Sequence, residues 1–296
     1  MLQIVPGQVK TAALHAYLLG AVAPRPICFA STVDADGHPN LSPFSFFNVF
    51  GSNPATLIFS PSRRVRDNTT KHTLDNIHAT GEVVINVVSY PMVQQASLSS
   101  CEYPQGVNEF EKAGFTPLPS EKIKPWRVKE SPVQMECVVK QVIATGQEGG
   151  AGNLVICEPV LIHISEAVLD EHQHIDPHKI DLVARMGADY YCRASGAAVF
   201  EVPKPNTRLG IGVDALPLSI RNSRILTGNN LGMLANIHEL PVIDPSFEDE
   251  QLKNIIQYYS ITPDEMEKEL HRYAQQLLES GKVREAWQVL LTAISC

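Results

Sequence analysis

Short apolar runs rich in Val, Ile, Phe or Thr dominate the chain as far as about residue 200, and Gly, Pro, Asp or Ser bounds each run. This pattern is typical of β-strands. Strands are predicted over residues 27–32, 41–48, 56–60, 83–88, 133–145, 153–165 and 197–201. The two longest are joined by the flexible connection Gly149-Gly150-Ala151-Gly152, and strands of this length can wrap around a barrel.

Helical spacing interrupts the strand pattern at residues 70–80. There, Leu74 and Ile77 share one face of a predicted short helix, while Lys71 and Asn76 are free to face elsewhere. A mainly β barrel with short helices between its strands fits this order better than alternating βαβ units.

The character of the chain changes at residues 202–206, which contain two prolines. Beyond Pro245 the pattern is helical, and Thr262-Pro263-Asp264-Glu265 is a strong helix start. The helix that it opens ends at Gly281, and its apolar positions are Met266, Leu270, Tyr273, Leu277 and Leu278. We therefore predict a barrel domain over residues 1–205 and a mostly helical C-terminal extension over 206–296. Its apolar stripe is expected to pack on the barrel or on a partner subunit.

Composition narrows the class of protein. The 296 residues carry a net charge of −8, and no block of like charges is present, which argues against nucleic-acid binding. No apolar run reaches the roughly 18 residues of a membrane-spanning helix, and no secretory signal is visible. A cytoplasmic protein that binds neither nucleic acid nor membrane is expected.

Cysteine and histidine do not form a metal-site pattern. No two of the six cysteines have zinc-site or redox-pair spacing, and Cys28, Cys137 and Cys157 lie in apolar runs where buried, reduced thiols are expected. His172, His174 and His178 invite a metal hypothesis, but their polar segment favours a solvated loop.

Two neighbouring segments carry the candidate chemistry. Residues 42–48 include Phe44, Phe46 and Phe47, and residues 60–73 are basic and rich in hydroxyl groups. A flat, uncharged ring system attached to a phosphate needs that pair of surfaces. The alternative is a plain β-hairpin with core aromatics, followed by a solvated basic helix start.

Five stretches occur in the order of a known family: Pro24-Arg25-Pro26-Ile27; Ser31-Thr32-Val33-Asp34 with Gly37 and Asn40; Ser42-Pro43-Phe44-Ser45-Phe46-Phe47-Asn48; Lys71-His72-Thr73 with Asn76; and Glu82-Val83-Val84-Ile85-Asn86-Val87. In this succession the chain resembles the flavin reductase-like family of FMN-binding split barrels, which includes flavoredoxin-type proteins. The resemblance runs from Pro24 to about Pro203. It implies a split barrel that binds FMN.

The phosphate of FMN needs cations and hydroxyl groups, which residues 60–73 supply in Ser60, Ser62, Arg63, Arg64, Arg66, Lys71 and Thr73. A helix start near Thr69 and Thr70 would add free amides. The resemblance selects Lys71, Thr73 and Asn76, although His72 replaces the usual Asp.

The flavin ring needs an apolar surface and hydrogen-bonding groups at its edge. Strand alternation predicts that Phe44, Phe46 and Asn48 face one side and Ser45 and Phe47 the other. The resemblance implies that the backbone of Phe44, Ser45, Phe46, Phe47 and Asn48 holds the ring.

The flavin itself carries hydride chemistry, which accounts for the lack of a catalytic dyad. No Gly-x-Gly-x-x-Gly opens a helix, so NADH or NADPH is expected to dock transiently over the flavin. Arg25 and His163 are candidates for lining that pocket. Arg185-Met186-Gly187 with Tyr190 resembles a family signature near the active site, with Ala188 in place of its second glycine.

The leading hypothesis is an FMN-binding oxidoreductase that reduces flavin with NAD(P)H or transfers electrons through bound FMN. It is expected to work as a homodimer with the cofactor near the subunit interface. Two alternatives remain: an FMN-binding electron carrier or oxidase on an unknown substrate, and a non-catalytic binding or scaffold barrel that has lost FMN.

Overall fold

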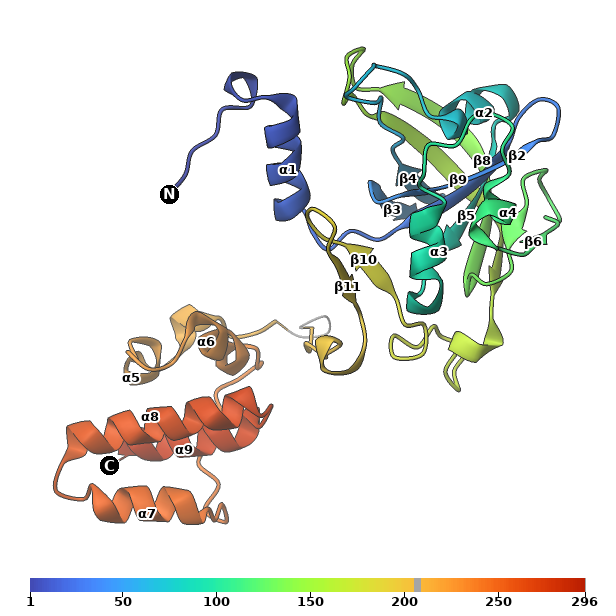
Figure 1. Ribbon diagram of the computed structural model, residues 1–296. Coiled ribbons are helices and arrows are strands. Elements are labelled where there is room, and N and C mark those ends of the chain that lie inside the picture. The colour runs from blue at the N-terminus through green and yellow to red at the C-terminus, as the bar shows by residue number, and fades with distance from the viewer. Residues whose placement is uncertain (205–208, 296) are drawn as a thin grey trace. The chain divides into compact units, whose positions relative to one another are not determined.

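The chain forms two compact units, Met1–Phe200 and Glu201–Cys296, in a computed structural model that describes residues 1–204 and 209–295 (Figure 1). The predicted domain boundary after residue 205 lies outside the described residues. Each unit has its own hydrophobic core, so each is described by itself.

The first unit is built on a seven-stranded sheet in the order β2-β1-β5-β8-β9-β4-β3. Each neighbouring pair is antiparallel. The strands are β1 Cys28–Val33, β2 Pro39–Phe44, β3 Phe47–Ser52, β4 Ala55–Phe59, β5 Glu82–Val87, β8 Val133–Ala144 and β9 Asn153–Ile164. The predicted mainly β architecture is therefore confirmed.

Helices and short ladders fill the connections of the first unit. The α-helices are α1 Thr11–Ala21, α2 His72–Thr80, α3 Val93–Leu98 and α4 Glu109–Ala113. Two-stranded ladders join β6 Pro117–Leu118 to β7 Arg127–Val128 and β10 Val183–Arg185 to β11 Tyr191–Arg193. Short 3-10 turns are η1 Pro6–Gln8, η2 Tyr90–Met92, η3 Glu166–Val168 and η4 Gly196–Ala198.

The interior of the barrel is apolar and includes three thiols. Phe44 and Phe59 pack with ring centroids 5.5 Å apart, and α2 adds Leu74 and Ile77 to the same cluster, on the face predicted for them. Cys28, Cys137 and Cys157 are buried and free, as predicted. Burial raises the pKa of the Cys28 thiol well above its usual range, which keeps the thiol neutral.

Two predicted strands differ from the structure. Residues 41–48 are not one strand, because β2 ends at Phe44, β3 begins at Phe47, and a bend separates them. The two strands lie at opposite edges of the sheet, so the chain must turn between them. Residues 197–201 pair with no described strand; η4 forms there instead, with Gly196 at φ +56°.

The predicted helix over residues 70–80 begins two residues late, at His72. The Arg64 amide donates to the Thr69 carbonyl at 2.9 Å, and the Arg64 guanidinium donates to the Thr70 carbonyl. Lys71, the residue before the helix, is extended (φ −91°, ψ 142°), so the helix starts only at His72. The helix is capped at its C-terminal end by Gly81, whose φ of 70° is the left-handed conformation that favours glycine.

The second unit is helical, as predicted. It contains η5 Val213–Ala215, α5 Leu218–Arg221, α6 Gly228–Ala235, α7 Glu250–Tyr258, α8 Pro263–Glu279 and α9 Val283–Ser295. The α8 stripe of Leu270, Tyr273, Leu277 and Leu278 is buried among residues of this unit, including Trp287 of α9. The expectation that the stripe docks on the barrel or on a partner is therefore wrong, because α6, α7 and α9 already cover it.

Two further sequence predictions concern the surface. His172, His174 and His178 are exposed in a loop, so the predicted solvated segment is confirmed. No helix in the described ranges is both long enough and apolar enough to cross a membrane.

His271 is expected to make the stability of the second unit depend on pH. Its side chain is buried, its Nδ1 lies 2.8 Å from Ser223 Oγ, and burial lowers its pKa below the usual value while Glu267 opposes that shift. A histidine with a lowered folded-state pKa stabilises the fold above its unfolded pKa of about 6.5, and this contribution is lost as pH falls through the folded pKa. We expect the melting temperature of this unit to decrease as the pH is lowered from 7.5 to 5.5. His271→Gln should reduce that dependence, and an unchanged dependence would contradict the assignment.

Candidate functional site

The basic loop, residues 60–73, is held in place by the hairpin that joins β8 to β9. The Arg63 amide donates to the Ala151 carbonyl at 2.8 Å, and the Gly150 amide donates to the Arg63 carbonyl at 3.0 Å. A Cβ on Gly149 would lie 3.0–3.1 Å from backbone atoms of the loop, so a side chain there would push the loop away. The glycines predicted as a flexible connection therefore also permit close packing.

Three arginines of the loop are already engaged. Arg63 donates to the side chain and the carbonyl of Asn68, both at 2.6 Å. Arg64 and Arg66 converge on the carboxylate of Glu102, at 2.9 and 2.8 Å. These arginines lower the pKa of Glu102 below its usual value, Arg66 contributing most. Two guanidinium groups are thus already paired with one carboxylate of the chain itself.

Lys71 is the remaining cation of the basic loop. It is half-buried, and its ammonium makes no hydrogen bond or ion pair among residues 1–204 and 209–295, although the charge of Glu102 acts to raise its pKa. Burial lowers its pKa below the usual value, and the charge of Arg64 lowers it further. A partly desolvated ammonium beside another cation is a place where a bound anion would be stabilised.

Thr73 and Asn76 lie in the interior instead. Asn40 Nδ2 donates to Thr73 Oγ1 at 2.9 Å, and Asn76 Nδ2 donates to Thr32 Oγ1 at 3.1 Å. Thr73 is only 1% exposed, because residues three apart on α2 share the face that packs on β1 and β2. These two side chains anchor the helix that follows Lys71, and their contact with a phosphate stays a prediction.

Ser60 is also a buried support. Its hydroxyl accepts from the Asn153 amide at 3.0 Å, and its residue is 8% exposed. This contact fixes the start of the basic loop against β9, and a contact of Ser60 with the phosphate stays a prediction.

The bend between β2 and β3 opens beside a small hollow of about 110 Å³. Its lining residues lie just before β1, at the end of β2, in and just after α3, and in β10 and β11: Ile27, Pro43, Phe44, Ser45, Val93, Ala96, Ser97, Ser100, Arg185 and Tyr191. Neither the Ser45 nor the Phe46 amide donates a hydrogen bond within the described ranges. The bend thus offers two free donors next to the hollow.

The other predicted ring-binding residues are divided by the bend. Phe46 is exposed and meets His15 of α1 edge to face, with centroids 6.1 Å apart. Phe47 packs against the barrel core, while Asn48 is exposed and accepts from the Val49 amide. The predicted two-sided alternation therefore fails beyond Phe44.

Arg25 positions the hollow without lining it. Its guanidinium donates to the carbonyls of Leu19, Val22 and Met186 and lies 3.5 Å from Ser45 Oγ. Burial lowers its pKa below the usual value, and the charge of Arg185 lowers it further. Arg25 thereby ties the end of α1 and residues 185–187 to the bend.

His163, the second candidate for lining the pocket, contacts Glu136 and not the hollow. Its Nε2 lies 2.8 Å from Glu136 Oε1, and the buried Glu136 carboxylate also accepts from the Glu121 and Lys122 amides. His163 is absent from the residues that line the hollow and serves this internal cluster.

The short helix α3 connects the two surfaces. Its Val93, Ala96 and Ser97 line the hollow, and Glu102, just beyond its end, binds the basic loop. Sequence reasoning missed Ser97, Glu102 and Tyr191. A helix following β5 was the signal that could have placed Ser97.

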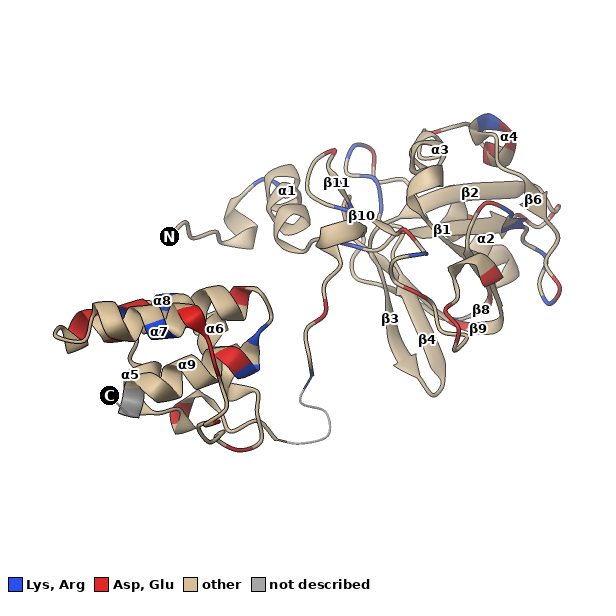
Figure 2. Ribbon diagram, turned by 90° about the horizontal axis from the view of Figure 1, so that it is seen from below, with Lys and Arg blue, Asp and Glu red and all other residues tan. Residues whose placement is uncertain are grey.

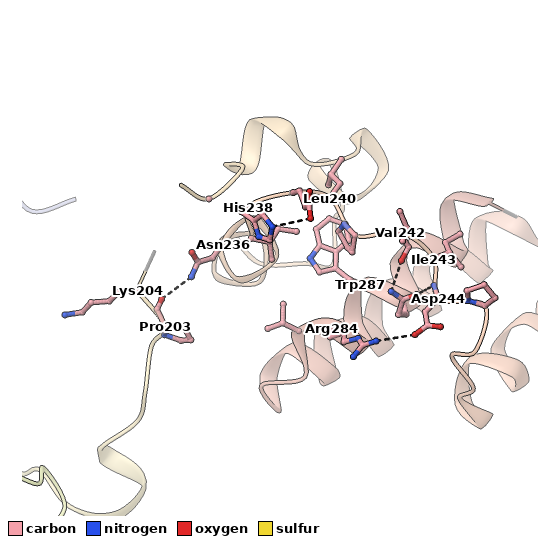
Figure 3. A pocket seen from close by; sticks show the side chains of 17 residues that line it. Pro203, Lys204, Asn236, His238, Leu240, Val242, Ile243, Asp244, Arg284 and Trp287 are labelled. Carbon is pink, nitrogen blue, oxygen red and sulfur yellow. Dashed lines mark hydrogen bonds and ion pairs between the residues drawn. The ribbon is translucent and has the colours of Figure 1, made fainter. Parts of the chain in front are cut away.

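A larger cavity of about 1100 Å³ lies within the second unit (Figure 3). Its polar side chains hold the unit together: Asn236 donates to the Pro203 carbonyl, Arg284 pairs with Asp244, and the Gln288 amide nitrogen donates to the Val242 carbonyl. The smaller hollow, in contrast, lies beside the two free amides of the bend and is lined by Arg185. The larger volume alone therefore does not make the second-unit cavity the candidate site.

The antiparallel sheet and the helices that fill its connections form the fold expected of a split barrel. Residues 20–180, more than half of the chain, match the family model described as the flavin reductase like domain, and the chain belongs to that family. The expected family and split-barrel fold are thus confirmed, and the family supports a flavin-linked oxidoreductase. The second unit lies outside the matched residues.

Known proteins resemble about two thirds of the chain. An uncharacterised protein of Aquifex aeolicus is 38% identical over 64% of this chain and 94% of its own. Among solved structures, nitrilotriacetate monooxygenase component B from Bacillus cereus is 28% identical with a TM-score of 0.64, covering 68% of this chain and 98% of its own. A putative flavin reductase with a split barrel from Shewanella frigidimarina is 26% identical, with a TM-score of 0.57 over 67% and 95%.

Proposed function

We propose that the protein binds FMN and uses it for NAD(P)H-dependent flavin reduction or a related electron transfer. The observation that carries the proposal is the unpaired, half-buried Lys71 in a loop of arginines, connected through α3 to a hollow with free backbone donors. A phosphate on a flat ring system would satisfy both surfaces. Family membership supports flavin as that ring system.

Each surface has its own task in this proposal. Lys71 supplies a point charge to the phosphate, and Arg64 and Arg66 supply planar forks as their bond to Glu102 is exchanged. The amides of Ser45 and Phe46 donate to the polar edge of the ring, and Phe44 keeps the bend packed. When bound, flavin supplies the hydride and electron chemistry.

FMN is favoured over FAD because one phosphate-sized basic segment is present and the sequence has no adenosine-binding fingerprint. NADH or NADPH is the proposed transient electron donor. An electron carrier or an oxidase would use the same cofactor site but would not oxidise NAD(P)H. A scaffold that has lost FMN does not account for the retained cation Lys71.

The charge on Glu102 is expected to weaken FMN binding, because its carboxylate occupies the arginines that the phosphate needs. Glu102→Gln should therefore raise FMN affinity by up to about fivefold, the range of exposed ion pairs. Riboflavin, which lacks the phosphate, should bind unchanged. Fluorescence titration measures both, and Glu111→Gln on α4 is the control. Weaker FMN binding in Glu102→Gln would instead mean that Glu102 orients the arginines for the phosphate.

A homodimer is proposed because large apolar surfaces are uncovered in a single chain. Helix α1 has no buried residue, and neither α1 nor the β3–β4 hairpin carries Lys, Arg, Asp or Glu (Figure 2). The exposed apolar side chains on β3 and β9 are Val49, Phe50, Val160, Ile162 and Ile164.

The dimer is expected to form through the first unit, since the α8 stripe is already buried. Light scattering should give twice the chain mass at micromolar concentration. Val49→Asp combined with Ile162→Asp should give the monomer, and Leu218→Asp, an exposed site of the second unit, should not. A monomeric wild-type protein that still retains FMN would contradict a shared site.

A further inference from the structure

The large cavity of the second unit lies between α9 and residues 236–245, the segment that joins α6 to α7 (Figure 3). Its volume of about 1100 Å³ is slightly above the range of about 300–1000 Å³ that is typical of sites for small ligands. Its lining is largely apolar and includes Ile237, Val283 and Trp287. The cavity lies outside residues 20–180, which match the family model, so a ligand bound there is independent of the flavin.

Buried polar contacts hold the walls of this cavity in place. Gln288, which is 5% exposed, accepts from the Asp244 amide at 2.8 Å and donates to the Val242 carbonyl at 3.1 Å. The indole nitrogen of Trp287 donates to the Leu234 carbonyl at 3.3 Å, which fixes the ring. The cavity is therefore preorganised by its own chain, and preorganisation lowers the entropic cost of binding a ligand.

One wall of the cavity offers backbone donors that the chain itself does not use. Residues 240–244 run without a turn or bend. The amides of Leu240, Val242 and Ile243 donate no hydrogen bond within the described ranges, and the side chains of these three residues are exposed. Unused amides flanked by exposed apolar side chains are the features through which a sheet edge pairs with an added strand.

Arg284 supplies a cation at the exposed edge of the cavity. Its Nη2 lies 3.3 Å from Asp244 Oδ2, whereas its Nε and Nη1 donate to no atom in the described ranges. Asp244 does not depend on this contact, because its Oδ1 accepts from the Ser246 amide at 3.0 Å and from the Ser246 hydroxyl at 2.6 Å. The bonds from Ser246 also contribute more than Arg284 to the lowered pKa of Asp244. The planar guanidinium can therefore accommodate a second carboxylate.

We propose that this cavity binds the C-terminal end of an extended apolar peptide from a partner protein. The terminal carboxylate pairs with Arg284, the peptide backbone pairs with the free amides of residues 240–243, and the apolar side chains enter the cavity beside Trp287. A fatty acid has the same carboxylate and an apolar body, but it has no carbonyls along its length to accept from the amides. Only a peptide uses all three features. The helical unit thereby attaches the first unit to another protein.

Fluorescence titration of the full-length Trp126→Phe protein tests the site, because Trp287 is then the only tryptophan and lines the cavity. The probes are acetyl-Ala-Val-Ala-Val with a free carboxylate, the same peptide with a C-terminal amide, and dodecanoate. We expect saturable binding of the free acid, and weaker binding of the amide and of dodecanoate. Arg284→Gln should lower the affinity for the free acid by about tenfold, to that of the amide, because a charge-assisted bond is removed. The affinity for the amide should not change.

Arg224→Gln is the matched control, since Arg224 is an exposed arginine of the same unit that does not line the cavity, and a thermal melt verifies folding. The proposal would be overturned if the free acid did not bind saturably, or if Arg284→Gln left its affinity unchanged. Equal loss of acid and amide binding in folded Arg284→Gln would also overturn it. Tighter binding of dodecanoate than of the free acid would assign the cavity to lipids instead of peptides.

Discussion

Lys71→Ala should weaken FMN binding by about tenfold or more and leave riboflavin binding unchanged. Lys71 is the half-buried cation without a partner in the described ranges, and a charged hydrogen bond to a phosphate contributes roughly 1.5–3 kcal/mol. The ratio of the two affinities isolates the phosphate contact from the ring contacts. Fluorescence titration of the apoprotein measures both ligands.

Lys129→Ala is the matched control for this experiment, since Lys129 is an exposed lysine of the same unit outside the basic loop. Equal loss of FMN and riboflavin affinity in Lys71→Ala would indicate a general disturbance of the barrel. Unchanged FMN affinity would place the phosphate elsewhere. Thr73→Ala should lower stability through its buried bond with Asn40, so it is unsuitable as a phosphate probe.

Leu270→Ala should destabilise the second unit by about 2–5 kcal/mol, because Leu270 is fully buried in the core of that unit. The transition of the first unit and its FMN affinity should stay unchanged, since the two cores are separate. Denaturant unfolding followed by flavin release and by Trp fluorescence in a Trp126→Phe background distinguishes the units, because Trp126 lies in the first unit. Trp287 reports on the second unit, where it is buried.

Leu218→Ala supplies the control, because Leu218 is exposed in the same unit. A simultaneous loss of FMN in Leu270→Ala would mean that the second unit supports the cofactor site. A single unfolding transition at unchanged denaturant concentration would contradict an independent helical core.

The strand pattern predicted much of the barrel because its long strands have one buried face. Residues 153–165 alternate around Val155 and Cys157, and β9 forms over nearly the same residues. The pattern failed at Ser45, since period-two alternation does not reveal that a strand leaves one sheet edge for the other. Aromatic residues continue through the bend and conceal it.

The candidate site could be located from the sequence, but the direction of its side chains could not. Lys71 and Thr73 are two residues apart, yet one is half-buried and unpaired and the other is buried in a network. That difference depends on where α2 begins, which the bonds from Arg64 to Thr69 and Thr70 decide. Glu102 reaches the basic loop through a tertiary contact that no local pattern encodes.

The covered stripe on α8 illustrates a different limit. The sequence predicts that Leu270 and Leu278 are buried, as they are, but it does not predict that the rest of the helical unit buries them. Trp287 and Leu290 of α9, together with α6, supply that cover within the unit. Amphipathicity predicts that a face is buried and does not identify what buries it.

The most direct test of the central claim is the absorbance spectrum of the purified full-length protein, before and after anaerobic addition of NADH or NADPH. We predict the spectrum of oxidised flavin, its bleaching by at least one of the two nucleotides, and release of a cofactor that co-chromatographs with FMN. Bound FMN that neither nucleotide bleaches would contradict NAD(P)H-dependent reduction. Colourless protein that takes up no added FMN would contradict the account as a whole.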